Sequence, residues 1–572
     1  MQEWRVYSKK ADFKALGDCF GIDPVVARII RNREVIGEEA VNRYINGNME
    51  DLYSPHLMKD MDKGVEIIRK SIENGDRIRI IGDYDIDGIC SIYILFKGMK
   101  KIGAQVDYDV PDRIIDGYGI NENLIKKAYD EGVNTIITCD NGIAAIEQIK
   151  YAKSLGMKVV ITDHHDVQYE DTDDGRVYII PDADAVVDPK QVDCEYPFKM
   201  LCGAAIAYKF IVSLYESLHM DMDESEEFIV FAAIATIGDI VDLQDENRII
   251  VKTGLTLISY SDNPGIKALL AINDLNPEAL TAYHIGFVIG PCLNASGRLD
   301  TAKRAIELFL SDEREIAEKY AGELKALNDE RKKITQIATD KAIELVDNTE
   351  LCKDKVLVVY ISDCHESVAG IVAGRIKEKY YRPTIVLTDG EDGLKGSARS
   401  IEGYNIFEKL LECKSLLTKF GGHPMAAGLS LPMENLNKLR MELNTNHGMS
   451  EDVLIEKIWI DAPMPIDYVS FKLIEDMKVL APFGKANEKP VFADKNLTIR
   501  QIQSLGKEGK FTKMYLVNNA GNGIEAVGFF DSTELKEAYG ANRKISCTYY
   551  PEINEYRGNR KLQICITGYR IE

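Results

Sequence analysis

The chain has 572 residues, of which 45% are hydrophobic and 28% charged, and its formal net charge at pH 7 is −22. This length predicts about three or four domains, and the composition excludes a largely disordered chain. So large a negative charge argues against a molecule that is basic on all sides. A local basic groove, or carboxylates that hold metal ions, can coexist with it.

The N-terminal sequence MQEWRVYSKK lacks the apolar core of a secretory signal. The longest apolar run, Phe228–Ile237, is far shorter than the roughly 20 residues that a membrane helix needs. The eleven cysteines occur without a CxxC pair, so neither a zinc ribbon nor a thioredoxin-type site is expected. We therefore expect a cytoplasmic protein with reduced thiols and no membrane partner.

Residues 1–70 are expected to form an N-terminal helical extension. Strands are then predicted where three apolar runs each stop at a carboxylate, at Arg77–Gly82, Thr135–Cys139 and Lys158–Thr162. Helix-length amphipathic segments separate these runs, and such alternation predicts a parallel sheet with both faces covered. Ligands on such sheets bind beyond the carboxyl ends of the strands, and all three of those ends are acidic here.

The rest of the chain divides into regions of different character. The α/β domain is expected to span residues 71–311, with a helical, apolar section toward its end, and a connecting helix is expected over 312–347. A second α/β module is expected over 348–450. Residues 455–572 contain short β-type runs broken by Gly and Asn turns, which predicts a small β-barrel.

The first strand leads into the motif DYDIDG, which contains Asp83, Asp85 and Asp87. DxDxDG also opens an EF-hand calcium loop, but that loop requires a glutamate at position twelve, where this chain has Ile94. The motif also follows a predicted strand rather than a helix. The EF-hand interpretation is therefore disfavoured.

Three more motifs contribute acidic or imidazole side chains. They are CDNGI with Asp140, TDHHD with His164 and His165, and GDIVDL, where an apolar helix ends at Asp239. One Asp after a strand is most often a helix N-cap, but four clusters are expected at one sheet edge. Carboxylates and imidazoles together suit Mn²⁺, Mg²⁺ or Fe²⁺. Two such ions about 4 Å apart would relieve the repulsion and could hydrolyse a phosphoester.

These four motifs, in this order, resemble those of the DHH phosphoesterase superfamily. CLNASGRL, LNDERK, SDCHESVAGIVAGRI, GSARS and FGGHPMAAGLSL are similar to sequences of its RecJ branch, the single-strand-specific 5′→3′ DNA exonucleases. The resemblance extends over nearly the whole chain. It implies a DHH domain, a long helix, a DHHA1 domain and an oligonucleotide-binding (OB) barrel. It also implies a metal-dependent enzyme that degrades single-stranded DNA to mononucleotides in recombination and repair.

The resemblance also implies which residues form the metal centre: Asp83, Asp85, Asp87, Asp140, His164 and Asp239. Asp140 is the expected bridging ligand and, with Asp85 and His165, is assigned to catalysis. Two assignments stay open, because Asp83 could lie behind the ligands and His165 could contact the scissile phosphate. Two divalent cations are expected, with Mn²⁺ preferred and Mg²⁺ as the alternative.

Other residues are expected to bind the DNA. The predicted set for the 5′ phosphate is Arg113, Arg298, Ser397, Arg399, Gly422 and His423, because Arg binds phosphate oxygens bidentately and Gly lets backbone amides approach. A single Arg is more often part of a surface ion pair, so the case rests on the set. In the barrel, stacking and charge predict a strand path over Lys507, Lys510, Lys513, Tyr556, Arg557 and Arg560.

Two alternatives remain open at this point. One is another DHH phosphoesterase, acting on short oligonucleotides, cyclic dinucleotides or pyrophosphate, which would not need the β-rich region. The other is a non-catalytic DNA-binding scaffold, which should have lost some of the metal-centre residues. The expected partner is single-stranded DNA with a 5′ end. The resemblance further implies a single-strand-binding protein and repair helicases as partners.

Overall fold

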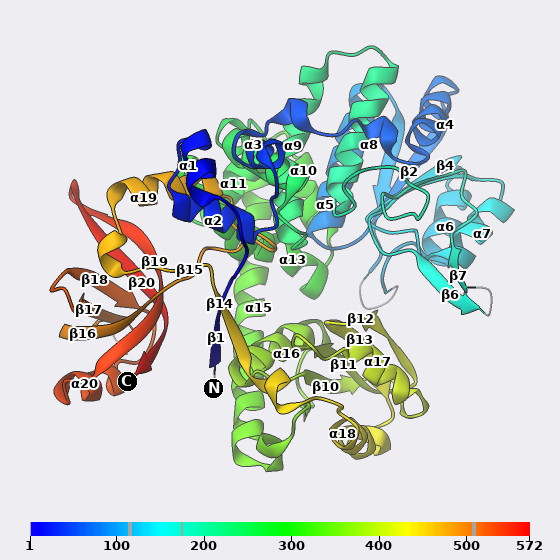
Figure 1. The fold of residues 1–572 in the computed structure, drawn as a ribbon. Helices are drawn as coiled ribbons and strands as arrows, with labels where there is room; N and C mark the ends of the chain where they lie inside the picture. The colour runs from blue at the N-terminus through cyan, green and yellow to red at the C-terminus, as the bar shows by residue number, and fades with distance from the viewer. Residues whose placement is uncertain (1, 113–116, 173–174, 506–510) are drawn as a thin grey trace.

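The computed structural model describes residues 2–112, 117–172, 175–505 and 511–572. The chain forms an α/β module, a second α/β module and a β-barrel, with a long helix between the two modules (Figure 1). Within the described ranges, no helix has the length and apolar character to cross a bilayer.

The first module is built on a sheet with the strand order β3-β2-β4-β5-β8, in which every pairing is parallel. The strands span Gln105–Asp109 (β3), Arg77–Gly82 (β2), Thr135–Cys139 (β4), Lys158–Thr162 (β5) and Ala185–Val187 (β8). The predicted parallel sheet is therefore confirmed, and its three predicted strands have the expected bounds.

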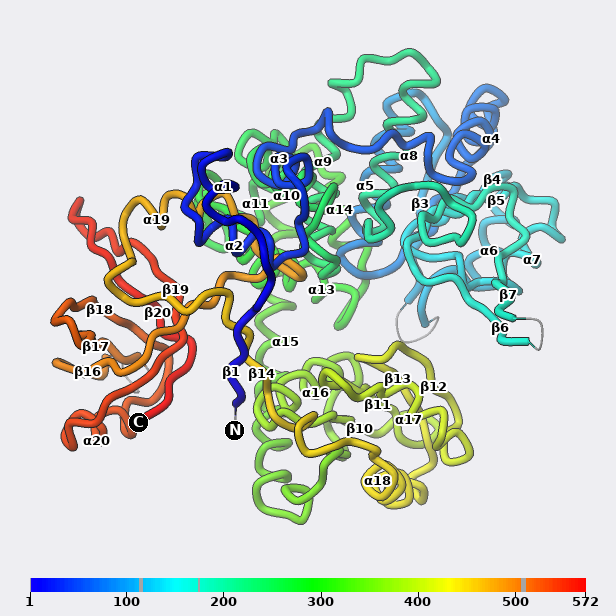
Figure 2. The backbone as a smooth tube through the Cα atoms, viewed as in Figure 1, coloured from blue at the N-terminus to red at the C-terminus, as the bar shows by residue number. Residues whose placement is uncertain are grey.

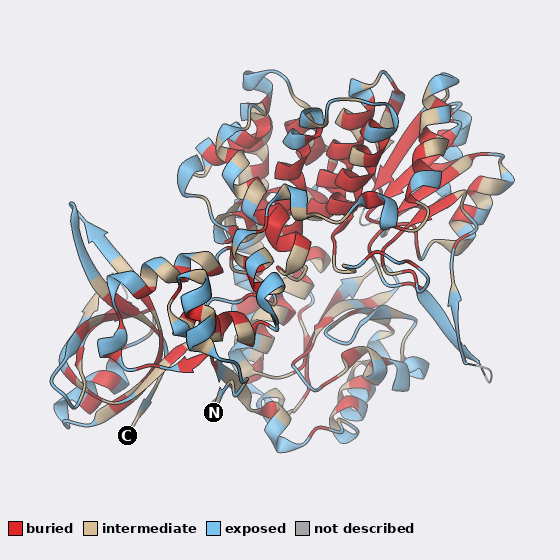
Figure 3. Ribbon diagram, turned by 45° about the horizontal axis from the view of Figure 1, so that its top comes forward, coloured by how far each residue is buried: buried red, intermediate tan, exposed pale blue. Residues whose placement is uncertain are grey.

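Helices cover both faces of this sheet because its strands are apolar on both sides. One face packs on helices α4 (Met61–Glu73), α5 (Ile86–Lys101) and α8 (Gly203–Ser217). The other packs on α6 (Glu122–Asp130) and α7 (Ile146–Ser154). The strands are buried in Figure 3, whereas the projecting hairpin of β6 (Gln168–Thr172) and β7 (Gly175–Ile179) is exposed.

A helical layer continues the core on the α5 side. It contains α9 (Glu226–Gly238), α10 (Asp245–Leu257), α11 (Pro264–Ile272), α12 (Ala282–His284), α13 (Gly290–Leu299) and α14 (Lys303–Leu310). Helix α15 (Arg314–Asn348) then leads to the second module and matches the predicted connecting helix closely. Its buried residues are mostly small, which lets it pack against both modules.

The second module has a sheet with the order β12-β13-β11-β10-β9, in which β9 and β10 pair in parallel and the other neighbours are antiparallel. The strands span Lys419–His423 (β12), Ala426–Leu431 (β13), Gly393–Arg399 (β11), Thr384–Gly390 (β10) and Leu357–Tyr360 (β9). Helices α15 and α16 (Glu366–Tyr380) cover one face. The other packs on α17 (Ile406–Glu412) and α18 (Leu436–Thr445).

The C-terminal strands form the predicted barrel, with the order β15-β16-β17-β18-β20-β19 and closure between β16 and β19. They span Ala462–Pro463 (β15), Phe492–Leu505 (β16), Phe511–Val517 (β17), Gly523–Gly528 (β18), Lys544–Tyr556 (β19) and Asn559–Ile571 (β20). Closure removes the unpaired edges that an open sheet would expose.

The N-terminal residues lie against the segment that leads into the barrel. In the backbone trace of Figure 2, β1 (Gln2–Val6) runs beside β14 (Glu456–Ile460), and the two strands pair in parallel. Helices α1 (Phe13–Phe20), α2 (Pro24–Asn32) and α3 (Glu38–Asn46) follow, and their apolar residues share one core with the barrel. Residues 1–70 thus contain a strand besides the expected helices.

Candidate metal centre

The acidic motifs meet at the carboxyl edge of the first sheet because each follows the end of an element there. Asp83 follows β2, Asp140 follows β4, and His164 and His165 come just after β5. Asp239 caps the C-terminus of α9, so the helical layer supplies it. Asp140 has a left-handed φ of 60°, a conformation that non-glycine residues seldom adopt and that clusters at functional sites.

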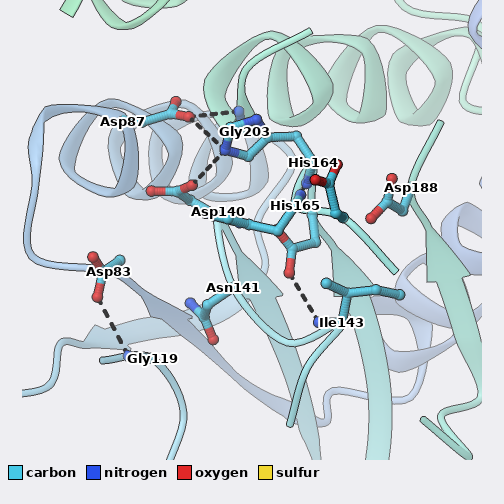
Figure 4. A network of polar contacts seen from close by, with 12 residues as sticks. Asp83, Asp87, Gly119, Asp140, Asn141, Ile143, His164, His165, Asp188 and Gly203 are labelled. Carbon is cyan, nitrogen blue, oxygen red and sulfur yellow. Dashed lines mark hydrogen bonds and ion pairs between the residues drawn. The ribbon is translucent and has the colours of Figure 1, made fainter. Parts of the chain in front are cut away.

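Backbone amides fix the carboxylates of the DYDIDG loop (Figure 4). Asp87 accepts hydrogen bonds from the amides of Gly203 (2.6 Å) and Ala204 (2.7 Å) at the start of α8. Asp83 accepts one from the amide of Gly119 at 3.4 Å. Asp85 caps helix α5 by accepting from the amide of Asp87 at 2.9 Å. The capping role and a ligand role are compatible, because a carboxylate has a second oxygen.

His164 lies at the centre of the cluster. Its Nε2 atom is 3.1 Å from an oxygen of Asp140, 3.5 Å from one of Asp87 and 3.8 Å from one of Asp239. Three groups of side chains have ligand atoms within 4.8 Å of one another: Asp83, Asp85 and Asp140; Asp87, His164 and Asp239; and Asp140, His164 and His165. The six predicted metal-centre residues and His165 therefore come together.

The carboxylates of the cluster are buried and repel one another, and both effects raise their pKa values. Burial and the negative charge of Asp85 raise the pKa of Asp87 to about 7, and burial and the charge of Asp87 raise that of Asp239 to about 8. The same two causes, burial and neighbouring carboxylates, raise the pKa values of Asp83 and Asp140. Burial lowers the pKa of His164 to about 3, which leaves a neutral imidazole able to coordinate. Such a donor set fits hard divalent cations.

His165 is held by Asp163, which was not among the predicted site residues. The Nδ1 atom of His165 lies 2.7 Å from Asp163 Oδ1, and the other carboxylate oxygen accepts from the amide of Ile143 at 2.8 Å. Burial alone would lower the pKa of His165, but Asp163 raises it to about 9. The hydroxyl of Tyr118 is 3.1 Å from His165 Nε2.

Other supporting residues were also missed by sequence reasoning. Asn141 donates to the carbonyls of Ile81 and Cys139 and accepts from the amide of Ile120, so it ties the ends of β2 and β4 together. A Cβ atom on Gly203 would lie 2.8 Å from that of Asp140. Their place in the sequence could have indicated them, because Asn141 and Asp163 belong to the same motifs as the predicted ligands.

The predicted 5′-phosphate residues lie mainly where the two modules face each other. Arg298, on α13 of the first module, donates to the carbonyl of Ser367 in the second at 2.8 Å. Ser397 and Arg399 lie on β11, where Gly370 of α16 leaves space for the guanidinium of Arg399. Arg113 lies outside the described residues.

Gly422 and His423 end strand β12. Gly422 has a φ of 149°, and a Cβ atom there would meet the Ala426 carbonyl oxygen at 2.4 Å, so only glycine fits. The pKa of Asp166 is lowered: burial raises it, but Lys190, 3.0 Å away, and His423 lower it. His423 therefore lies close enough to the TDHHD loop to act on its charge, although the two belong to different modules.

The described residues of the predicted strand path lie at separate places on the barrel. Lys513 forms a 3.0 Å ion pair with Glu525 on β18. Tyr556 and Arg557 sit at the turn between β19 and β20, with the guanidinium 5.2 Å from the ring centroid, and Arg560 lies 5.5 Å from the Phe471 ring. Lys513 pairs with Val527 of β18, which in turn pairs with Cys565 of β20. Cys565 lies roughly 20 Å along β20 from the turn. Lys507 and Lys510 lie outside the described residues.

Comparison with protein families divides the chain into known domains. Residues 77–236 match the DHH family N-terminal domain, 353–446 the DHHA1 domain and 460–568 the RecJ OB domain. A parallel sheet with this carboxylate and histidine cluster, followed by a DHHA1 module, defines a DHH-type phosphoesterase.

Curated relatives narrow the class further. The single-stranded-DNA-specific exonuclease RecJ of Bacillus subtilis is 36% identical, over 98% of this chain and 70% of that protein. The Escherichia coli RecJ is 32% identical, over 95% of each. The chain therefore belongs to the RecJ family.

Solved structures agree on the fold. RecJ of Thermus thermophilus in complex with Mn²⁺ superposes with a TM-score of 0.83 over 99% of this chain and 79% of that one, at 23% identity. An exonuclease RecJ bound to manganese gives a TM-score of 0.60 over 69% of this chain and 96% of that one, at 28% identity. The predicted arrangement of DHH module, DHHA1 module and barrel is thereby confirmed.

Proposed function

We propose that this protein is a metal-dependent exonuclease that degrades single-stranded DNA from its 5′ end to mononucleotides in recombination and repair. The observation that carries the proposal is the convergence of seven carboxylate and imidazole side chains at one sheet edge. Relatives that span most of the chain are named single-stranded-DNA-specific exonucleases. The retention of all seven residues argues against a non-catalytic scaffold.

The geometry suggests how the residues share two ions. Asp83, Asp85 and Asp140 form one ligand group, and Asp87, His164 and Asp239 form the other. Asp140 would be the ligand shared between the two groups, because it belongs to the first group and lies 3.1 Å from His164 of the second. Two divalent cations held here would activate water and neutralise charge on the phosphate. We infer that Mn²⁺ is preferred and Mg²⁺ also accepted; RecJ relatives have been crystallised with each.

His165 is proposed to contact the scissile phosphate rather than a metal ion. Asp163 holds Nδ1, which leaves Nε2 to bind another group, and a ring nitrogen of His165 lies within 4.8 Å of ligand atoms of Asp140 and His164. An imidazolium so oriented can donate a hydrogen bond to a phosphate oxygen as negative charge grows there. Asp163 then acts as a positioning residue that fixes the ring.

The second module is proposed to hold the 5′-terminal phosphate. Arg399 supplies a planar fork of donors, Ser397 a hydroxyl, and Gly422 an open backbone next to His423. His423 contributes to the lowered pKa of Asp166. This supports the assignment, because the end of β12 must lie near the metal-centre loops for that effect. Arg113 and Arg298 are proposed to join this set. A strand held at both places would present its first internal phosphodiester to the metal ions.

We also propose a cytoplasmic location, since the substrate is DNA and every cysteine, all within the described residues, is a free thiol. A single-strand-binding protein and repair helicases are the proposed protein partners. The closest competing function is hydrolysis of short oligonucleotides or cyclic dinucleotides by another DHH phosphoesterase. The match of residues 460–568 to the RecJ OB domain favours long strands instead.

One assay tests these proposals together. With Mn²⁺ present, 5′-labelled single strands, blunt duplexes and cyclic dinucleotides are offered to the protein separately. We expect rapid release of labelled mononucleotide from the single strand alone. Preferential hydrolysis of the cyclic dinucleotide would support the competing function instead. Release of the label in long fragments would contradict exonuclease action.

A further inference from the structure

Two aromatic side chains stand exposed on the surface of the helical layer. The rings of Tyr283 and Phe287 are stacked, with centroids 4.8 Å apart and planes inclined by 26°. Tyr283 is 63% exposed and Phe287 is 68% exposed. Adjacent large apolar side chains that remain this accessible commonly mark a binding surface. Stacking on each other leaves ring faces available to a further planar group.

The local backbone holds these rings outward. Between α12 and α13 the helix widens into a π-helical turn over Ile285–Ile289, an uncommon feature that is frequent at functional sites. Ile285 and Ile289 are buried in the core of the first module and anchor this turn. Tyr283 and Phe287 project from the opposite face, one helical turn apart, so their stacking is set by the backbone.

The same helical segment lies against the metal-centre loops. A Cβ atom on Gly286 would be 3.5 Å from the side chain of Ile237, which precedes Asp239 by two residues. Further along, Asn294 accepts a hydrogen bond from the amide of Ile86, between Asp85 and Asp87, at 2.8 Å. The end of α9, which leads to Asp239, and the start of α5, beside Asp85 and Asp87, therefore both pack on this one segment.

The aromatic pair and Arg298 lie on this one segment, Tyr283 and Phe287 around the π-helical turn and Arg298 in the last turn of α13. None of the three is buried. Phe287 and Arg298 are eleven residues apart, roughly 16 Å along a helix axis. The aromatic pair thus stands near one end of a segment whose other end carries the proposed phosphate-binding arginine, and the elements that bear Asp85, Asp87 and Asp239 pack on that segment.

We propose that Tyr283 and Phe287 form a stacking platform for bases of the DNA strand, next to the metal centre. This inference rests on the proposed function. Unpaired bases offer their faces to aromatic rings whatever their sequence, whereas bases in a duplex are already stacked. The platform therefore adds to the preference for single strands without reading sequence.

Strand binding without catalysis tests the platform directly. The affinity of a 5′-phosphorylated oligo-dT is measured by fluorescence anisotropy in EDTA. The double variant Tyr283→Ala/Phe287→Ala is expected to bind about 10- to 100-fold more weakly, and Phe287→Trp to bind as the unmodified protein does. Tyr260→Ala is the matched control, because Tyr260 is also a highly exposed aromatic residue of the first module, 78% accessible. Thermal melting checks that each variant folds.

Abasic nucleotides separate stacking from other contacts. Placed one at a time along the strand, they keep the phosphates and remove single bases. We expect at least one position to weaken binding to the unmodified protein and to have no further effect on the double variant. Equal affinity of the double variant and the unmodified protein, or an abasic penalty that persists in the double variant, would overturn the platform. A surface used by a protein partner would give that same overturning result.

Kinetics distinguish failure of this inference from failure of the proposed function. With Mn²⁺, the double variant is expected to show a raised KM for long strands and a kcat close to that of the unmodified protein. If the unmodified protein does not cleave single strands, the proposed function fails, and the binding comparison still decides the platform. If it cleaves and KM is unchanged in the double variant, the platform alone is refuted.

Discussion

The Nε2 atom of His164 lies 3.1 Å from an oxygen of Asp140, although the two residues follow different strands of the sheet. The contact brings a residue of the group Asp83, Asp85 and Asp140 next to one of the group Asp87, His164 and Asp239, and the two residues also share a third group with His165. A single side chain at this junction should therefore control both ion sites.

Replacing Asp140 tests the junction. Asp140→Ala should reduce kcat by more than the roughly 100-fold that loss of an outer partner of a metal ligand costs, while strand binding survives. Hydrolysis of a 5′-labelled strand and anisotropy of the same strand measure the two effects. Asp262→Ala is the matched control, because its exposed carboxylate pairs with Lys267 on the surface. Near-normal turnover of the Asp140 variant would remove the bridging role.

The support of His165 by Asp163 can be tested with an isosteric change. Asp163→Asn keeps the shape of the side chain but replaces one acceptor oxygen by an amide donor, so it cannot accept from Ile143 and from both histidines as the carboxylate does. We expect kcat to fall about 10- to 100-fold with a smaller change in KM. A variant with unaltered kcat would show that the orientation of His165 does not matter for the reaction.

The proposed phosphate site predicts a selective effect at Arg399. Arg399→Ala should reduce the advantage of a 5′-phosphorylated strand over a 5′-hydroxyl strand, because a bidentate partner is lost. The measurement is kcat/KM for both strands. Arg314→Ala, at the exposed start of α15, serves as the control. Equal losses on the two strands would count against end recognition by Arg399.

Close packing behind the metal centre predicts sensitivity at Gly203. Gly203→Ala would place a methyl group 2.8 Å from Asp140 and 3.2 Å from a carboxylate oxygen of Asp87, so both side chains must shift. We expect weaker Mn²⁺ binding by calorimetry and lower activity at limiting metal. Gly374→Ala is the control, because no atom lies within 4 Å of its new methyl group. Unchanged Mn²⁺ affinity would mean that the loops adapt without cost.

The N-terminal segment should depend on one buried ion pair. Arg33 and Asp461 are almost fully buried and lie 2.7 Å apart, with a second contact at 3.0 Å. Arg33→Met leaves the Asp461 charge unpaired and should destabilise this interface by about 3–5 kcal/mol. Limited proteolysis should then release the N-terminal helices at a lower temperature. The double variant Arg33→Met/Asp461→Leu should recover much of the loss, and its failure to do so would point to packing rather than charge.

Sequence reasoning located most of the metal centre because parallel strands end at the same edge of a sheet. Asp83, Asp140 and His164 each follow an apolar run, so their meeting could be predicted from pattern alone. Asp239 was placed at the same edge although it ends a helix rather than a strand, and the resemblance to known motifs supported that placement. The supporting role of Asp163 was not predicted, because the sequence does not distinguish a buried hydrogen-bond acceptor from a metal ligand.

Relations over long sequence distance were beyond such reasoning. The contact between Arg33 and Asp461 joins residues 428 positions apart, and no local pattern encodes it. Lys513 was expected to face DNA, but it forms an ion pair with Glu525, a diagonal neighbour on β18. The sequence alone does not reveal this neighbour, because it depends on the register of the barrel strands. The exposure of Tyr283 and Phe287 depends likewise on which side of their helix the core occupies.

The pairing of β1 with β14 has a consequence for synthesis of the chain on the ribosome. Strand β1 is synthesised more than 450 residues before its partner strand. Until then the apolar side chains of α2 lack the barrel with which they share a core. The parallel-sheet module can complete its own core much earlier, so β1 and α2 should remain exposed on the nascent chain while that module is already folded.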